Sequence, residues 1–154
     1  MSRIDIYEKL SQLGISLPTA GAPAAAYVMC RQTGSSVYLS GHIAKRDGNV
    51  WVGKLGETLA TEEGKQAARL TAIDVLASLH TFLGDLNRVQ GIIKLMCLVN
   101  SAPDYTEQHL VTNGASELLA EIFGEDGKHA RSAFGVAQIP LGACLELEMT
   151  VQVA

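Results

Sequence analysis

Two charged residues near the C-terminus, Arg131 and Glu146, lie in segments whose apolar neighbours predict β-strands. Arg131 stands where a polar turn gives way to an apolar segment, so its guanidinium can reach out from a rigid strand edge and bind a carboxylate through paired hydrogen bonds. Glu146 lies on the next predicted strand, after a Pro-Leu-Gly connection. An antiparallel pairing of residues 132–139 with 143–153 would leave Glu146 nearer the turn than Arg131.

The two residues therefore need not touch within one chain, and a neighbouring subunit could bring them together. The alternative interpretation is an exposed arginine at a sheet edge and a solvated strand face that carries Glu146 and Glu148.

The other reactive side chains form no known catalytic or metal-binding motif. His129 lies two residues before Arg131, and His42 follows Ser40 and Gly41 at a predicted strand end, so both are weaker candidates for the chemistry. The three cysteines are widely spaced, form no CxxC pair and have no histidine at metal-ligand spacing, which favours buried free thiols. Phosphate-binding glycine loops and the zinc-protease and serine-hydrolase motifs are also missing. We expect no metal and no cofactor.

The composition argues against two classes of partner. The 12 Lys and Arg residues against 16 Asp and Glu residues give a net charge of −4, whereas binding to nucleic acid needs clustered positive charge. The apolar runs are far shorter than the roughly 18 residues of a membrane span, and the N-terminus does not resemble a signal peptide. We expect a soluble cytoplasmic protein. With 47% apolar and only 18% charged residues, some apolar surface is expected to be buried between subunits.

The length of 154 residues predicts one domain that spans residues 1–154. Ser2 and Asp5 resemble a helix capping box, which predicts an additional N-terminal helix within residues 1–17. The clearest strand signal is the alternation of apolar and polar residues in 143–153. The other expected elements are strands at 25–32, 36–40 and 49–52, a helix from Thr61 to Gly84, a strand at 88–100, a helix from Pro103 to Gly124, and a strand at 132–139.

This order of elements predicts the α+β class, as a sandwich in which helices pack on one face of a single mixed β-sheet. Such a sheet leaves its second face open. Three copies of the chain closing around an axis would cover that face.

Three C-terminal segments resemble a known signature: Ala130-Arg131-Ser132, Gln138-Ile139-Pro140 and Leu145-Glu146-Leu147-Glu148. They are similar to the C-terminal part of the YjgF/RidA-like proteins, also known as L-PSP endoribonucleases or translation-initiation inhibitors. Tyr27, residues 39–43 and Asn113 match further positions, so the resemblance covers roughly residues 22–154. The added N-terminal helix resembles a divergent, longer branch of that family.

The resemblance implies a chorismate-mutase-like α+β fold and a homotrimer with clefts at the subunit interfaces. In the deaminase branch, the residue that matches Arg131 binds the substrate carboxylate. The residue that matches Glu146 orients the water that hydrolyses an enamine or imine to a 2-oxo acid and ammonia. The ligand-binding positions implied in the cleft are Tyr27, Ser40, Gly41, Asn113 and Ala133, the last standing where the short proteins commonly have cysteine.

Three functions follow as hypotheses. The first is hydrolysis of a reactive enamine or imine, which needs an anchored carboxylate and a positioned water but neither metal nor cofactor. The second is an endoribonuclease or translation-initiation inhibitor, which the negative net charge and scarce aromatic residues argue against. The third is a non-catalytic trimer that binds a small carboxylate-bearing metabolite in the same Arg131 pocket.

Overall fold

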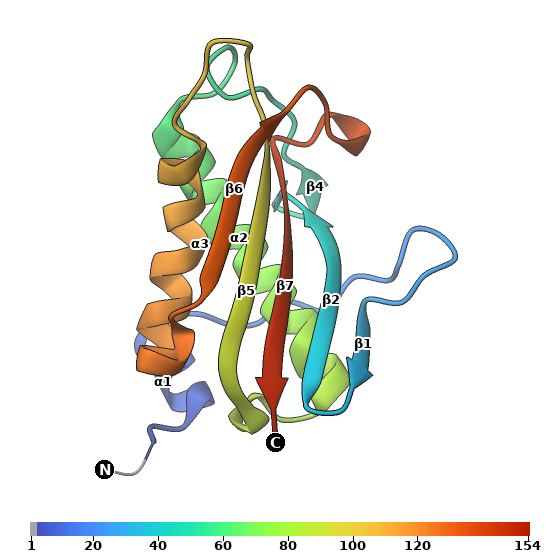
Figure 1. Ribbon diagram of the computed structural model, residues 1–154, viewed down its shortest axis with the longest axis vertical. Helices are drawn as coiled ribbons and strands as arrows, with labels where there is room; N and C mark the ends of the chain where they lie inside the picture. The colour runs from blue at the N-terminus through green and yellow to red at the C-terminus, as the bar shows by residue number, and fades with distance from the viewer. Residues whose placement is uncertain (1–2) are drawn as a thin grey trace.

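The computed structural model describes residues 3–154, which form a twisted sheet with helices against one face (Figure 1). Five strands make the sheet in the order β1-β2-β7-β5-β6, and β3 and β4 form a separate short hairpin. The elements are α1 (Ile6–Gln12), β1 (Cys30–Thr33), β2 (Ser36–Ile43), β3 (Lys45–Arg46), β4 (Asn49–Val50), α2 (Thr61–Leu83), β5 (Val89–Asn100), α3 (Gln108–Phe123), β6 (Ala130–Val136) and β7 (Leu145–Val153). The predicted α+β class, with a mixed sheet and helices on one face, is confirmed.

The central strand, β7, pairs antiparallel with both β2 and β5, and β6 pairs parallel with the far side of β5. The direct pairing of residues 132–139 with 143–153 is therefore wrong, because β5 lies between the two strands (Figure 1). Their connection does not form a hairpin. It passes through a short 3-10 turn, Pro140–Gly142, in which Leu141 has a φ of 62°, and it crosses the end of β5.

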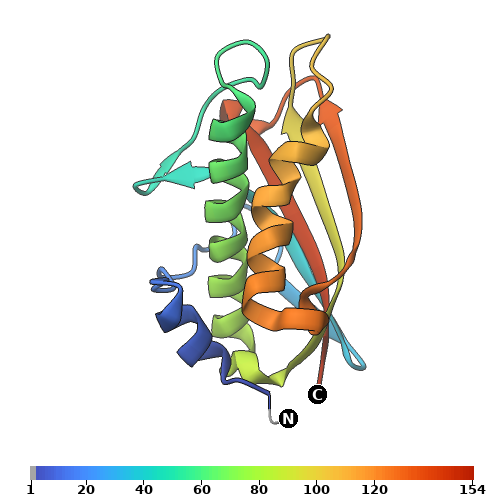
Figure 2. The same cartoon turned by 90° about the vertical axis from the view of Figure 1, so that its left-hand side faces the viewer.

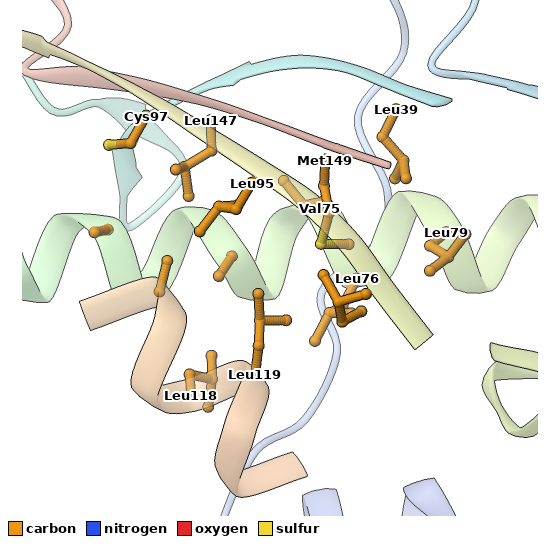
Figure 3. Close-up of a cluster of buried hydrophobic side chains, with 14 of the residues drawn as sticks. Leu39, Val75, Leu76, Leu79, Leu95, Cys97, Leu118, Leu119, Leu147 and Met149 are labelled. Atoms are coloured by element: carbon orange, nitrogen blue, oxygen red, sulfur yellow. The ribbon is translucent and has the colours of Figure 1, made fainter. Parts of the chain in front are cut away.

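The core lies between the sheet and the two long helices, α2 and α3, which run side by side (Figure 2). Alternate residues of β7 from Leu145 to Val153 are buried, as the sequence pattern predicts. Figure 3 shows side chains of the sheet, among them Leu95 and Leu147, meeting Val75, Leu76 and Leu119 of the helices. This face of the sheet is thus covered by helices.

The N-terminal helix α1 packs at the C-terminal end of α2 (Figure 2). Its N-cap is Asp5, whose carboxylate accepts hydrogen bonds from the backbone N–H groups of Tyr7 and Glu8. Ser2, predicted as the cap, lies outside the described residues. The Tyr7 hydroxyl accepts a hydrogen bond from the N–H of Leu86 at 2.8 Å and lies 2.8 Å from His80 Nδ1. These bonds join α1 to the body of the protein.

Several boundaries differ from the prediction for local reasons. Residues 25–29 form no strand and residues 25–28 are exposed, so the first strand is only Cys30–Thr33. The third helix begins at Gln108 and not at Pro103, because the preceding loop is held to α2 through Thr61. The Thr61 hydroxyl lies 2.7 Å from the Tyr105 hydroxyl and 2.7 Å from the Glu107 carboxylate. Thr61 is thus the first residue of α2 and holds the loop instead of capping the helix.

Within residues 3–154, no helix combines the length and apolar character that crossing a membrane requires.

Candidate functional site

Arg131 lies at the start of β6, the outermost strand on one side of the sheet. Its partner in the parallel register is the buried Leu95 of β5, so its side chain leaves the sheet on the side that α3 covers. There Nη1 donates to Asn113 Oδ1 at 2.7 Å and to Ser116 Oγ at 3.3 Å. Both partners belong to α3, and the structure therefore brings two predicted site residues, Arg131 and Asn113, together.

His129 joins the same cluster through Ser116. The His129 Nδ1 atom lies 2.7 Å from the carbonyl oxygen of Gly127, and Nε2 lies 2.9 Å from Ser116 Oγ. A carbonyl oxygen only accepts, so Nδ1 must carry the proton. In the neutral imidazole Nε2 is then an acceptor, and the Ser116 hydroxyl donates to it.

Glu146 lies on β7 and points to the open face of the sheet, where it is half-buried. Burial, followed by the negative charge of the nearby Glu148, raises the pKa of its carboxyl group. Among residues 3–154 no basic side chain approaches it within salt-bridge distance. This carboxyl group therefore has no compensating cation among those residues.

Gly41 provides the space that Glu146 occupies. Strand β2 is irregular between Leu39 and His42, and Gly41 lies in this irregular segment, opposite β7. A Cβ atom at Gly41 would come within 2.9 Å of Glu146 Cδ and closer still to the carboxylate oxygen. The Glu146 side chain can therefore take this position only because residue 41 is a glycine. Gly41 and Glu146, two more of the predicted site residues, are thus neighbours.

Tyr27 and Ser40 lie at the opposite edge of the sheet from Arg131. Ser40 Oγ donates to the Val28 carbonyl at 2.6 Å, which ties β2 to the bend before β1. Tyr27 is 44% exposed, and its hydroxyl accepts a 3.3 Å hydrogen bond from the N–H of Ala24. A hollow of about 440 Å³ lies between these segments and is lined by Tyr27, Val28, Arg31, Tyr38, Leu39 and Ser40.

The predicted site is thus divided into two groups in one chain. Arg131, Asn113 and Ala133 lie along β6 and α3, with Ala133 beside Cys97 in the register. Tyr27, Ser40, Gly41 and Glu146 lie around β2 and β7. Strand β5 separates the groups, because Arg131 pairs with one of its flanks at Leu95 and Glu146 pairs with the other at Leu98. Arg131 and Glu146 do not share a cleft within a single chain.

His42 belongs to neither group. Its Nδ1 lies 2.7 Å from the Ser40 carbonyl and its Nε2 lies 2.7 Å from the Ser78 hydroxyl, so both ring nitrogens are occupied. The side chain is buried, and burial is the main cause that lowers its pKa. His42 therefore supports the irregular segment of β2 next to Gly41.

The sequence prediction missed Ser116. Ser116 follows Asn113 by three residues, and residues at this spacing lie on the same side of a helix. His129 and Arg131 are two apart, which is the spacing of residues on one face of a strand. The two spacings become informative only once α3 and β6 are known to be adjacent.

Comparisons with known proteins agree with this fold. Residues 7–150 match the family described as "YjgF/chorismate mutase-like, putative endoribonuclease". The chain is 46% identical over 145 residues to Protein TCP17 of Trypanosoma cruzi, covering 93% of this chain and 91% of that protein.

Two crystal structures are similar over nearly the whole chain. The protein Atu1372 of Agrobacterium tumefaciens, whose function is unknown, is 38% identical with a TM-score of 0.89 and coverage of 97% of this chain and 92% of that one. A protein from Shewanella oneidensis MR-1, described as a "putative endoribonuclease", is 28% identical with a TM-score of 0.93 and coverage of 97% and 100%. The matched fold, the signature around Arg131 and the extent of these similarities together lead to one conclusion: the chain belongs to the YjgF/chorismate-mutase-like family.

Proposed function

We propose that this protein hydrolyses a reactive enamine or imine that carries a carboxylate, and that it releases a 2-oxo acid and ammonia. The observation that carries the proposal is the environment of Arg131. Its Nη1 group is held by Asn113 and Ser116, whereas Nε and Nη2 meet no hydrogen-bond acceptor in the described part of the chain. A guanidinium that is fixed on one side and free on the other is suited to binding the carboxylate of a small substrate.

Glu146 is the group suited to proton transfer. Its raised pKa brings the carboxyl group closer to the neutral range in which a general acid or base is effective. In the proposed reaction, Glu146 accepts a proton from a water molecule as the water oxygen bonds to the imine carbon and the C=N bond becomes a single bond. That proton passes to the nitrogen and gives a carbinolamine. Glu146 then moves the hydroxyl proton of the carbinolamine to the nitrogen as the C–N bond breaks, so that ammonia leaves and the carbonyl forms. An enamine enters this path after protonation of its β-carbon.

The proposal includes a homotrimer, because Arg131 and Glu146 belong to separate groups within one chain. The β6 edge of one copy would meet the open sheet face of the next, so that a cleft between copies contains both residues. Apolar side chains on the open face support this arrangement. Tyr38 and Phe134 are exposed there, and Met96 and Leu98 of β5 are only half-buried. An apolar patch of this kind is typical of a surface that a partner subunit covers.

Two other functions would use the same site. A trimer that only binds a carboxylate metabolite needs Arg131 but has no use for the raised pKa of Glu146. An endoribonuclease, the activity suggested for the Shewanella oneidensis protein, needs cationic and aromatic side chains for RNA. A net charge of −4 and an aromatic content of 5% offer few of either.

Ammonia release from freshly generated 2-aminoacrylate tests the proposal. We expect Arg131→Ala to raise KM by about tenfold or more because a charge-assisted bond is lost. We expect Glu146→Gln to lower kcat by roughly 100-fold because it removes the proton-transfer group. Glu62→Gln, which changes an exposed carboxylate in the first turn of α2, is the control and should stay near the wild-type rate.

The other outcomes separate the alternatives. Ammonia release by the wild type at the uncatalysed rate would overturn the hydrolase proposal. Carboxylate binding without turnover would instead support the metabolite-binding trimer. RNA cleavage that survives Arg131→Ala and varies with the purity of the preparation would indicate a contaminating nuclease.

A further inference from the structure

We infer that Ser116 and His129 are positioning residues that fix the Arg131 guanidinium so that it meets a ligand carboxylate side-on, through Nε and Nη2. The inference rests on the proposed function to the extent that this ligand is the carboxylate of the substrate. The contacts that carry it lie within one chain, between α3 and the strand β6.

The Arg131 guanidinium divides its hydrogens between the protein and a ligand. Nη1 carries two, and the structure gives it two acceptors, Asn113 Oδ1 at 2.7 Å and Ser116 Oγ at 3.3 Å. An end-on carboxylate would need one hydrogen from Nη1 and one from Nη2. With Nη1 fully engaged by the protein, the remaining bidentate arrangement uses the Nε–H and one Nη2–H.

The Ser116 hydroxyl can accept from Arg131 only when its own proton points elsewhere. A hydroxyl whose proton pointed at the guanidinium would repel it and could not accept from Nη1. His129 prevents this, because its Nε2 accepts the hydroxyl proton at 2.9 Å and leaves the lone pairs of Ser116 for Arg131. The His129 ring is in turn held in this tautomer by its 2.7 Å hydrogen bond to the Gly127 carbonyl.

Packed elements of the fold hold the partners of Arg131 in place. Asn113 and Ser116 lie on a helix whose neighbouring residues Gly114 and Ala115 are buried, and His129 follows a short 3-10 turn that ends at the buried Gly127. A Cβ atom at Gly127 would come within 2.7 Å of the Leu119 backbone, so the turn that carries the acceptor for His129 is packed directly against α3. We call the hydrogen-bonded series Gly127–His129–Ser116–Arg131 the relay. Its first two members are held by the packed turn before β6, and Ser116 is held by α3.

Two variants of His129 separate the parts of the relay. Asparagine places its amide N–H near the position of Nδ1, so His129→Asn keeps the contact with Gly127 and loses the acceptor for Ser116. Glutamine places its amide oxygen near the position of Nε2, so His129→Gln keeps an acceptor for Ser116. Pyruvate is the 2-oxo acid formed from 2-aminoacrylate, so its Kd measures binding of the carboxylate without turnover. We expect His129→Asn and Ser116→Ala each to raise KM for the imine and Kd for pyruvate by about fivefold to tenfold. We expect kcat to change by less than about twofold.

We expect His129→Gln to stay within about twofold of the wild type, and the double variant Ser116→Ala/His129→Asn to be no worse than either single variant. Additive losses in the double variant, or equal losses in His129→Gln and His129→Asn, would overturn the relay. A role that was merely structural would lower the unfolding midpoint and kcat together instead of raising KM alone.

A measurement on the guanidinium itself keeps the relay testable if the proposed function fails. In protein labelled with ¹⁵N-arginine, restricted rotation about the Nε–Cζ bond gives separate Nη1 and Nη2 signals. We expect separate signals for Arg131 in the wild type and in His129→Gln, and merged signals in Ser116→Ala and His129→Asn. Separate signals in a wild type that neither hydrolyses the imine nor binds pyruvate would overturn the function and support the relay. Merged signals in the wild type would overturn the relay whatever the activity.

Discussion

The carboxylate of Glu146 on β7 occupies the space that a side chain at Gly41 on β2 would fill. The two residues are far apart in the sequence, yet each determines what the other position can hold. Burial within this contact contributes to the raised pKa of Glu146, because a charged carboxylate is less well solvated there.

Gly41→Ala should therefore impair the site more than the fold. The new methyl group must displace the Glu146 carboxylate, so we expect imine hydrolysis to fall by about tenfold or more while overpacking lowers the free energy of unfolding by about 1–3 kcal/mol. Ammonia release and urea unfolding measure the two effects. Gly91→Ala is the matched control, since a Cβ at this strand glycine meets nothing closer than 3.9 Å. Unchanged turnover in Gly41→Ala would show that the position of Glu146 does not matter.

His42 should make the protein less stable in mild acid. Its pKa is lowered from the ordinary value of 6.5, chiefly by burial, so the folded state favours the neutral ring. The stability that this provides is complete above pH 6.5 and is lost as the pH falls from there through the lower folded-state pKa. We expect the free energy of unfolding to decrease over this window.

His42→Gln provides the control for that prediction. The variant removes the titrating ring but keeps an amide that can accept from Ser78, so its unfolding free energy should change less than that of the wild type between pH 8 and pH 5.5, roughly the window of histidine titration. Asp74 and Glu146 have raised pKa values, which oppose the trend at lower pH, but they are common to both proteins. Parallel pH profiles for wild type and variant would contradict the assignment to His42.

Two helix glycines should respond differently to alanine. In an open helix, Gly→Ala stabilises by about 1 kcal/mol. A Cβ at Gly114 of α3 would meet the backbone carbonyl of Lys65 on α2, which cannot move without separating the helices. A Cβ at Gly64 would instead meet side-chain atoms of Leu55 and Val111, at 2.7 and 2.8 Å.

We expect Gly114→Ala to destabilise by more than about 2 kcal/mol, and Gly64→Ala by less, because side chains can repack and a backbone cannot. Chemical unfolding of the two variants tests this comparison under identical conditions. A stabilised Gly114→Ala protein would mean that α2 and α3 are not in close contact at this point.

Much of the fold could be predicted from the chain itself. The alternation through β7 is a local pattern that predicts both the strand and its buried face. The recurring apolar residues of α2 and α3 predict the helices, but they do not predict the whole buried face of α2, where Leu70 is 37% exposed and small residues such as Ala67 and Ala72 are buried. The partner of β6 could not be predicted in this way, because strand pairing depends on contacts remote in the sequence. The neighbouring segments 132–139 and 143–153 suggested a hairpin, whereas β7 lies between β2 and β5.

The candidate site shows the same division. Arg131 and Glu146 could be selected from their charge within apolar strands and from the family resemblance. The role of Ser116 could not, because a serine in the middle of a helix is common and its partners come from β6 and the turn before it. The delayed start of α3 has a similar origin, since Thr61 binds Tyr105 and Glu107 from a different element.

The position of β5 between β6 and β7 has a consequence for variants that are inactive. Because this strand stands between Arg131 and Glu146, no rotation of side chains within one chain can unite them. If both residues serve one reaction, that reaction needs two copies of the chain, and pairs of variant copies should reveal this. A copy damaged at Arg131 and a copy damaged at Glu146 would each be inactive alone, yet mixed in one oligomer they would rebuild intact clefts from their undamaged halves. Alleles of the two kinds would then complement each other within a single gene.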